Sequence, residues 1–205
     1  LELYTNSFYA ILPGLTTSLD AMSDYLAVKA VPTFVQEGAF TPTLSSGWTW
    51  TQLRNINYFI TNNKDPKVPE DIRRNYTALA KFFRAYFYFE KVKRFGDVPW
   101  TGIALDVSDP VLYGPRDPRT LIMDSVLADI NYACANIALT TDASRSLITK
   151  YIAYALKSRI CLFEGTFRKY HTELNLQATA STWLTDAAAA AKTIMDQGGF
   201  TINTS

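Results

Sequence analysis

The segment from Glu70 to Phe95 has the clearest pattern of polar and apolar positions in the chain. Polar residues recur there at short helical steps and form one stripe, made of Arg74, Thr77, Lys81, Arg84, Lys91 and Arg94. Apolar and aromatic residues fill the rest of the circumference, among them Ile72, Tyr76, Leu79, Phe82, Phe83, Tyr86, Phe87 and Phe89. This pattern predicts a helix over residues 71–95 that is solvated along one stripe only and is the most buried helix of the chain. Gly96 and Pro99 are expected to end it, because glycine adopts the left-handed conformation of a helix terminus and proline prevents the helix from resuming.

Upstream, shorter helices are predicted over residues 3–12 and 50–60. The first is expected to stop at Pro13 and Gly14, because proline cannot donate the hydrogen bond that a continuing helix needs. Little of the remaining sequence alternates between apolar and polar residues as strands do. Prolines and glycines gather instead in four segments that we predict to be loops, residues 13–47, 62–69, 96–116 and 139–148.

Downstream, three more helices are predicted. One follows Asp117 and Pro118, with the Asp117 side chain as its cap and the proline in its first turn. The next begins at Thr149, and the last runs over residues 181–198. The inner face of the helix after Thr149 is predicted from its spacing to hold Ile152, Leu156, Ile160 and Phe163. The chain is therefore predicted to be all-α, with stacked helices and long loops, although the pattern alone does not identify a repeat.

Length and composition narrow the class of protein. A chain of 205 residues is enough for one domain with a real core. Its 20 Lys and Arg balance 19 Asp and Glu, so no charge excess attracts nucleic acid or an anionic membrane surface. No apolar run is long enough to span a bilayer. The chain starts without an initiator methionine or signal sequence, so we expect residues 1–205 to be a single helical domain from a longer protein.

The residues that usually carry catalysis or metal binding are scarce. His171 is the only histidine, which leaves catalytic triads and paired-histidine zinc sites without a member. Glu173 lies close to it in sequence, but an exposed histidine beside a loop is normally just solvated. Cys134 and Cys161 fall on apolar helix faces and are expected to be buried thiols. We therefore expect no enzymatic activity, no cofactor and no metal.

Five stretches, in order along the chain, resemble the SusD/RagB family of surface nutrient-binding lipoproteins. The most specific is RRNYTALAKFFRAYFYFEKVKRFGDVPW, and the others are WTQLRNINYFI, PRTLIMDSVLADINYA, ITKYIAYALKSRICLFEG and WLTDAAAAAKTIMDQGGFTI. Together they cover residues 48–202. The resemblance implies irregular tetratricopeptide-like helix pairs with inserted loops. It also implies that this chain is the N-terminal part of a protein more than twice as long.

The same resemblance implies a function. Members of the family are not enzymes; they capture glycans or other nutrients and sit as a lid on a SusC-like TonB-dependent transporter. The expected location is the cell surface at the outer membrane, with membrane contact only through a lipid anchor outside this chain. A helical repeat scaffold that binds proteins and no small ligand stays open as the alternative.

The family's ligand contacts come partly from the loop after the first helix and partly from regions beyond Ser205. Here that loop reads YLAVKAVPTFVQEGAF and lacks the tryptophans of starch-binding members, which argues against starch. The candidate ligand-binding residues are Tyr25, Phe34, Gln36 and Trp48, the last if it is exposed on its loop. Phe40 is a further candidate for stacking on a sugar. Trp100 follows the helix-stopping proline and is predicted to serve packing.

Overall fold

The computed structural model describes residues 1–13, 29, 37 and 47–201 of the chain. Within these residues it contains six α-helices and four short 3-10 turns. The helices are α1 (Glu2–Asn6), α2 (Thr51–Asn62), α3 (Glu70–Phe95), α4 (Arg119–Asn136), α5 (Lys150–Tyr170) and α6 (Ala180–Gln197). The turns are η1 (Ser7–Ile11), η4 (Pro110–Tyr113), η5 (Thr172–Leu174) and η6 (Gln177–Thr179). Strand-like pairing in this part of the chain is limited to one isolated bridge between Val98 and Asp117, so the predicted all-α fold is confirmed.

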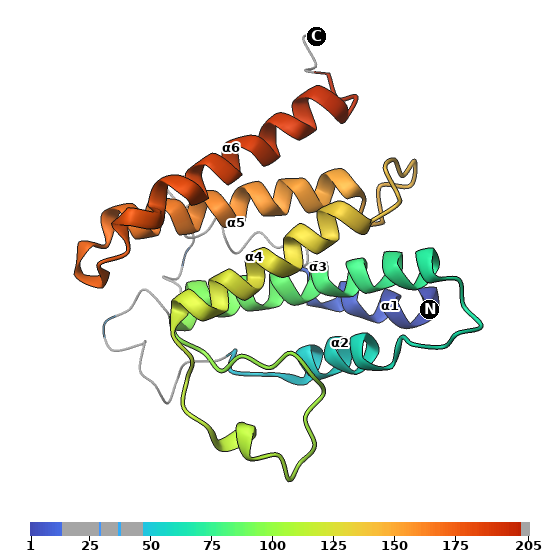
Figure 1. Cartoon of the computed structure of the whole chain (residues 1–205), viewed down its shortest axis with the longest axis horizontal. Coiled ribbons are helices and arrows are strands. Elements are labelled where there is room, and N and C mark those ends of the chain that lie inside the picture. The colour runs from blue at the N-terminus through green and yellow to red at the C-terminus, as the bar shows by residue number, and fades with distance from the viewer. Residues whose placement is uncertain (14–28, 30–36, 38–46, 202–205) are drawn as a thin grey trace.

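The helices follow one another as neighbours in a stack. From α2 to α6, each helix packs mainly on the one that precedes it and the one that follows it. Figure 1 shows successive helices running in opposite directions, from α1 and α2 at one side to α6 at the other. This arrangement is the irregular tetratricopeptide-like pairing that was expected. Long loops, above all the one between α3 and α4, separate the pairs. No helix of the described residues is long and apolar enough to cross a membrane.

Helix α3 is the centre of the core, as predicted. It contributes more buried residues than any other described helix, although α4 is buried over a similar share of its length. Its Phe83 is fully buried and meets the rings of Phe8 and Tyr9 with centroids 5.9 and 4.9 Å away. The helix ends at Gly96, whose φ of 69° only glycine adopts without strain.

The predicted solvated stripe of α3 is wrong at two of its positions. Arg84 is 6% exposed and Lys91 is 9% exposed. Arg84 binds Asp129 of α4 through two nitrogens, with Nε 2.5 Å and Nη2 2.9 Å from the two carboxylate oxygens. Lys81 adds a third contact to the same carboxylate at 2.9 Å. The stripe follows helical spacing correctly, but at Arg84 helix α4 packs over it and supplies the charge that lets an arginine be buried. Lys91 instead contacts the segment at Gly47.

The start of α4 differs from the prediction. Asp117 does not cap this helix; its carboxylate accepts a hydrogen bond from the Trp100 amide at 2.7 Å. The amide of Arg119, the first helical residue, donates instead to Asp97 at 2.8 Å. Asp97 is twenty-two residues away in sequence, so local spacing gave no sign of this cap. Together these bonds tie the two ends of the α3–α4 loop to each other.

The start of α5 is as predicted, because the Thr149 hydroxyl accepts a hydrogen bond from the Ile152 amide. Three of the four predicted inner positions face the core, since Ile160 is fully buried and Leu156 and Phe163 are partly buried against it. The prediction is wrong for Ile152, which is exposed, while the neighbouring Ala153 is fully buried. Helix α6 approaches α5 closely at Gly165, where an added Cβ would lie 2.8 Å from the Leu184 side chain. The small residues of α5 thus set its face against α6.

Both cysteines are free and buried, as predicted. Burial raises the pKa of the Cys134 thiol to about 11 and that of the Cys161 thiol to about 12. Both therefore remain protonated at neutral pH and act as small apolar side chains.

Candidate functional site

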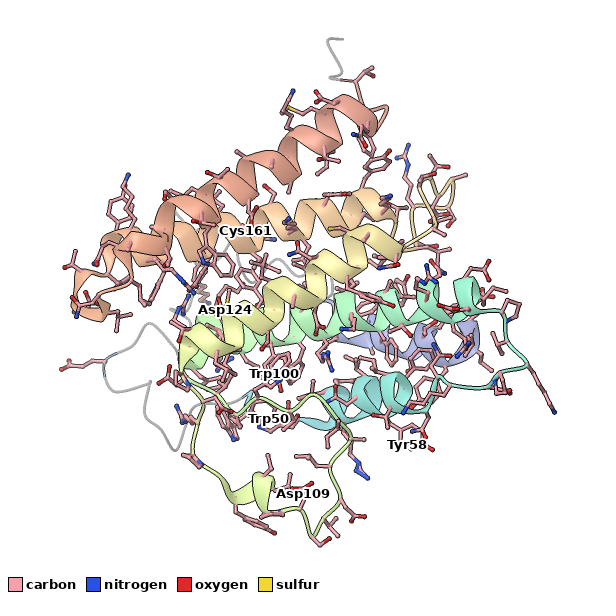
Figure 2. The ribbon with its side chains drawn as sticks, viewed as in Figure 1. Trp50, Tyr58, Trp100, Asp109, Asp124 and Cys161 are labelled. Atoms are coloured by element: carbon pink, nitrogen blue, oxygen red, sulfur yellow. The ribbon has the colours of Figure 1, made fainter. Side chains whose placement is uncertain are left out.

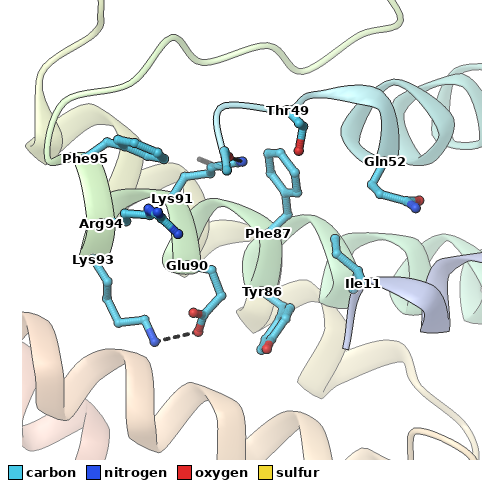
Figure 3. A pocket seen from close by; sticks show the side chains of 11 residues that line it. Ile11, Thr49, Gln52, Tyr86, Phe87, Glu90, Lys91, Lys93, Arg94 and Phe95 are labelled. Carbon is cyan, nitrogen blue, oxygen red and sulfur yellow. Dashed lines mark hydrogen bonds and ion pairs between the residues drawn. The ribbon is translucent and has the colours of Figure 1, made fainter. Parts of the chain in front are cut away.

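A pocket of about 450 Å³ lies between the C-terminal half of α3 and the segment that leads into α2. We call it the α3 pocket. Its lining residues in the described chain are Ile11, Gly47, Thr49, Gln52, Tyr86, Phe87, Glu90, Lys91, Lys93, Arg94 and Phe95. Figure 3 shows Phe87 and Lys91 pointing toward the segment that carries Thr49 and Gln52, with Lys93 and Glu90 on the opposite side. The pocket therefore combines an aromatic wall with several polar groups.

Three aromatic side chains form a platform beside this pocket. Trp48 meets Trp50 and Phe95 edge to face, with ring centroids 5.1 and 4.9 Å apart. Trp48 is 41% exposed, so it belongs to the surface and not to the core. The Arg116 guanidinium lies 4.8 Å from the centroid of the Trp48 ring. We call Trp48, Trp50 and Phe95 the aromatic platform; a flat ring of this kind can cover the C–H face of a sugar.

Lys91 fixes the segment that presents the platform. Its ammonium donates a hydrogen bond to the Gly47 carbonyl. It also lies 4.9 Å from the Phe87 ring centroid and 5.5 Å from that of Trp50, a cation–π arrangement. Gly47 has a φ of 93°, and a Cβ there would meet Arg94 at 3.1 Å. The chain thus turns tightly against α3 immediately before Trp48.

Several charged and titratable side chains line the α3 pocket and influence one another. Burial lowers the pKa of Lys91, and the nearby charge of Arg94 lowers it further. Lys93 and Glu90 form an ion pair at 2.6 Å. Burial and the charge of Glu90 raise the pKa of Tyr86. Tyr86 is therefore a neutral hydroxyl at physiological pH, able to donate or accept a hydrogen bond.

Of the four candidate ligand-binding residues, only Trp48 can be placed. Tyr25, Phe34 and Gln36 lie outside the described residues, and so does Phe40. Sequence reasoning did not single out Phe95 or Lys91 for this site. Lys91 was read as part of a solvated stripe, and the only sign to the contrary was its position four residues from Phe87 and Phe95 on an aromatic helix.

Trp100 serves packing, as predicted. Its ring centroid lies 4.3 Å from that of Tyr88, and Val98, two residues earlier, is fully buried. Figure 2 shows Trp100 and Trp50 between α2 and the layer of α3 and α4. The ring centroid of Trp50 also lies 6.3 Å from that of Tyr88. Trp50 and Trp100 therefore pack against the same tyrosine, whereas Trp48 is the exposed tryptophan of this group of rings.

A second pocket, of about 650 Å³, lies where the ends of α3 and α5 meet the start of α4. Arg119 lines it and pairs with the buried Glu164 at 2.5 Å, while Arg168 holds the other oxygen of that carboxylate at 2.8 Å. Asp124 lies 3.6 Å from Arg168 and balances the remaining charge. The charges of these ion pairs balance, as in a structural network, but two buried nitrogens of the described residues, Arg119 Nε and Arg168 Nη2, have no hydrogen-bond partner.

The described residues contain no cluster of three or more side chains suited to a metal ion. His171 pairs with Glu173 at 2.8 Å and stacks on Phe167 at 4.1 Å. The pair lies at the exposed end of α5.

The model of the SusD-like family described as "Starch-binding associating with outer membrane" matches residues 20–157. SusD-like protein P2 of Formosa agariphila is 30% identical over 92 residues, which are 45% of this chain and 18% of that protein.

Two solved structures have a similar fold. A SusD superfamily protein from Parabacteroides distasonis matches with a TM-score of 0.64 and 22% identity, over 76% of this chain and 31% of that one. A laminarin-binding SusD-like protein matches with a TM-score of 0.59 and 20% identity, over 75% of this chain and 31% of that one. The chain thus spans less than a third of the length of each of these relatives.

Proposed function

The chain belongs to the SusD-like family, and on this premise we propose that it is the N-terminal helical domain of a longer protein that binds glycans at the cell surface. Residues 1–205 would form this single domain. The length of the relatives supports the proposal, since each is more than three times as long as the part that this chain matches. One of the similar structures is itself a laminarin-binding protein.

The observation that carries glycan binding is the exposed Trp48 at the edge of the α3 pocket. A tryptophan that is held by two other rings and still 41% exposed offers a rigid apolar surface. Covering about 100 Å² of sugar C–H surface would contribute about 2.5 kcal/mol. Thr49, Gln52 and Tyr86 line the adjacent pocket and supply polar groups for hydroxyls. The platform alone would bind weakly, so we place further contacts in Tyr25, Phe34, Gln36 and regions beyond Ser205.

The proposed partner is a SusC-like TonB-dependent transporter of the outer membrane. The description of the family model associates its members with that membrane. We propose that the intact protein is a surface-exposed lipoprotein whose lipid anchor lies outside this chain. The role that we propose is capture and delivery of a nutrient, with no chemical step.

A scaffold that binds only proteins is the second candidate. The loop between α3 and α4 favours it, because this loop projects from the helical stack and exposes apolar residues (Figure 1). These are Ile103, Val107, Val111, Leu112 and Tyr113. A contact with the transporter would use the same surface, so the loop is compatible with the first proposal as well.

The experiment compares the intact protein of which we propose this chain to be a part with its Trp48→Ala variant on a glycan array, followed by native electrophoresis in gels that contain the selected polysaccharide. We expect the variant to lose at least about tenfold in affinity, since the platform's apolar surface goes with the indole. Tyr170→Ala is the matched control, because Tyr170 is an exposed aromatic residue at the far end of α5. If the intact wild-type protein retains no glycan, or if both variants bind equally, the proposal is wrong.

A further inference from the structure

The α3 pocket has an excess of positive charge. Its described lining contains Lys91 and Lys93 with one carboxylate, Glu90, and also Arg94, which has a further interaction of its own. Arg116 adds a fourth cation beside the pocket, 4.8 Å from the ring centroid of Trp48. The chain as a whole has 20 basic and 19 acidic residues, so this local excess does not follow from its composition.

The single carboxylate is already engaged. Glu90 pairs with Lys93 at 2.6 Å along one turn of α3. Figure 3 shows this pair pointing away from Lys91, toward the other side of the helix. The pair therefore neutralises Lys93 and leaves the charge of Lys91 in place.

Lys91 is a buried cation that has no counter-charge among the described residues. It is only 9% exposed, and its ammonium contacts the Gly47 carbonyl and the faces of aromatic rings. In the described part of the chain, no carboxylate lies within ion-pair distance of this ammonium. An ammonium has three donors, so hydrogen-bonding capacity remains after the bond to Gly47. Burial and the charge of Arg94 both lower its pKa, which is the expected response of a cation without an anion nearby.

An anionic group in the pocket would correct this imbalance. It would accept a charge-assisted hydrogen bond from Lys91 and lie within the field of Arg94 and Arg116. A neutral sugar would leave the lysine charge uncompensated and, by covering the pocket, would remove water from it as well. The electrostatics of the pocket thus favour a charged ligand over an uncharged one of the same shape.

We propose that the glycan bound at the α3 pocket is acidic, carrying carboxylate or sulfate groups, with its sugar face on Trp48 and its anion toward Lys91. This inference rests on the proposed function, because it names the class of glycan that the same site selects. The two anions share the chemistry that Lys91 recognises.

The first experiment measures binding of the intact protein to four probes: oligogalacturonate, its methyl ester, a sulfated carrageenan oligosaccharide and a laminarin oligosaccharide. We expect a charged probe to bind at least about tenfold more tightly than the neutral ones. We also expect its affinity to fall when NaCl is raised from about 0.05 M to about 0.5 M. Comparison of oligogalacturonate with the carrageenan probe tells a carboxylate from a sulfate ligand.

The outcomes separate the two proposals. Neutral probes that bind as tightly as charged ones would overturn the acidic-glycan inference and leave glycan binding intact. An absence of binding to all four probes, combined with an empty glycan array, would overturn both proposals.

Variants test the role of Lys91 in the bound state. We expect Lys91→Gln to reduce affinity for the charged probe at least about tenfold more than affinity for neutral probes, which also falls because Lys91 holds the segment that presents Trp48, while Lys91→Arg restores binding. Lys192→Gln is the control, since Lys192 is an exposed lysine on α6, away from the α3 pocket, and its partner is Asp196. The melting temperature of each variant checks its folding. Equal loss for charged and neutral probes in a folded Lys91→Gln chain would contradict the inference.

Discussion

Replacing Phe83 with alanine is expected to lower the free energy of unfolding by about 3 to 5 kcal/mol. Phe83 is fully buried in α3 and packs against Phe8, Tyr9 and Phe82. The truncation removes the transfer free energy of a whole ring and leaves a cavity among rigid aromatic neighbours, which cannot collapse to fill it. Urea denaturation followed by circular dichroism measures the change.

The matched control is Phe200→Ala. Phe200 is an exposed phenylalanine near the end of the described chain, and its only described ring contact is with Tyr151. We expect its truncation to change the free energy of unfolding by less than about 1 kcal/mol. A Phe83→Ala effect as small as that of the control would mean that the core is not centred on α3.

Replacing Asp129 with alanine is expected to cost about 3 to 5 kcal/mol of stability as well, for a different reason. The change would leave the Arg84 guanidinium, which is 6% exposed, buried without its carboxylate. Asn57 and the Gly102 carbonyl would still accept hydrogen bonds from Arg84, but neither carries charge. Thermal and urea unfolding measure the loss.

Two further variants distinguish the cost of burying a charge without its partner from the cost of lost packing. The double variant Arg84→Met with Asp129→Leu removes both charges, and we expect it to be more stable than Asp129→Ala alone. Asp196→Ala breaks the exposed pair with Lys192 and should change stability by less than about 0.5 kcal/mol. If Asp129→Ala is no more destabilising than this control, the buried network contributes little to stability.

The sequence predicts the helices well because their signals are local. The period of α3, its stop at Gly96 and the Thr149 cap each depend on residues within a turn or two. The errors depend on distant contacts. Arg84 is buried because Asp129 of another helix faces it, and the cap of α4 comes from Asp97 across a long loop. Neither contact leaves a trace in local spacing.

The candidate site could be predicted only in part. Trp48 stood out as an aromatic residue after a glycine, but its exposure depends on the bond between Lys91 and Gly47 and on contact with Phe95. Those contacts join segments more than forty residues apart. Tyr25, Phe34 and Gln36 stay predictions. The transporter partner and the surface location stay proposals.

The most direct test of the account is the response of the tryptophan indole signals in a ¹⁵N–¹H NMR titration with the glycan selected on the array. The chain has four tryptophans, so each can be followed separately after assignment with single Trp→Phe variants. The account predicts that the Trp48 signal shifts progressively to saturation, while that of the buried Trp183, on α6, stays in place. A glycan that binds without moving the Trp48 signal would contradict the placement of the site at the aromatic platform.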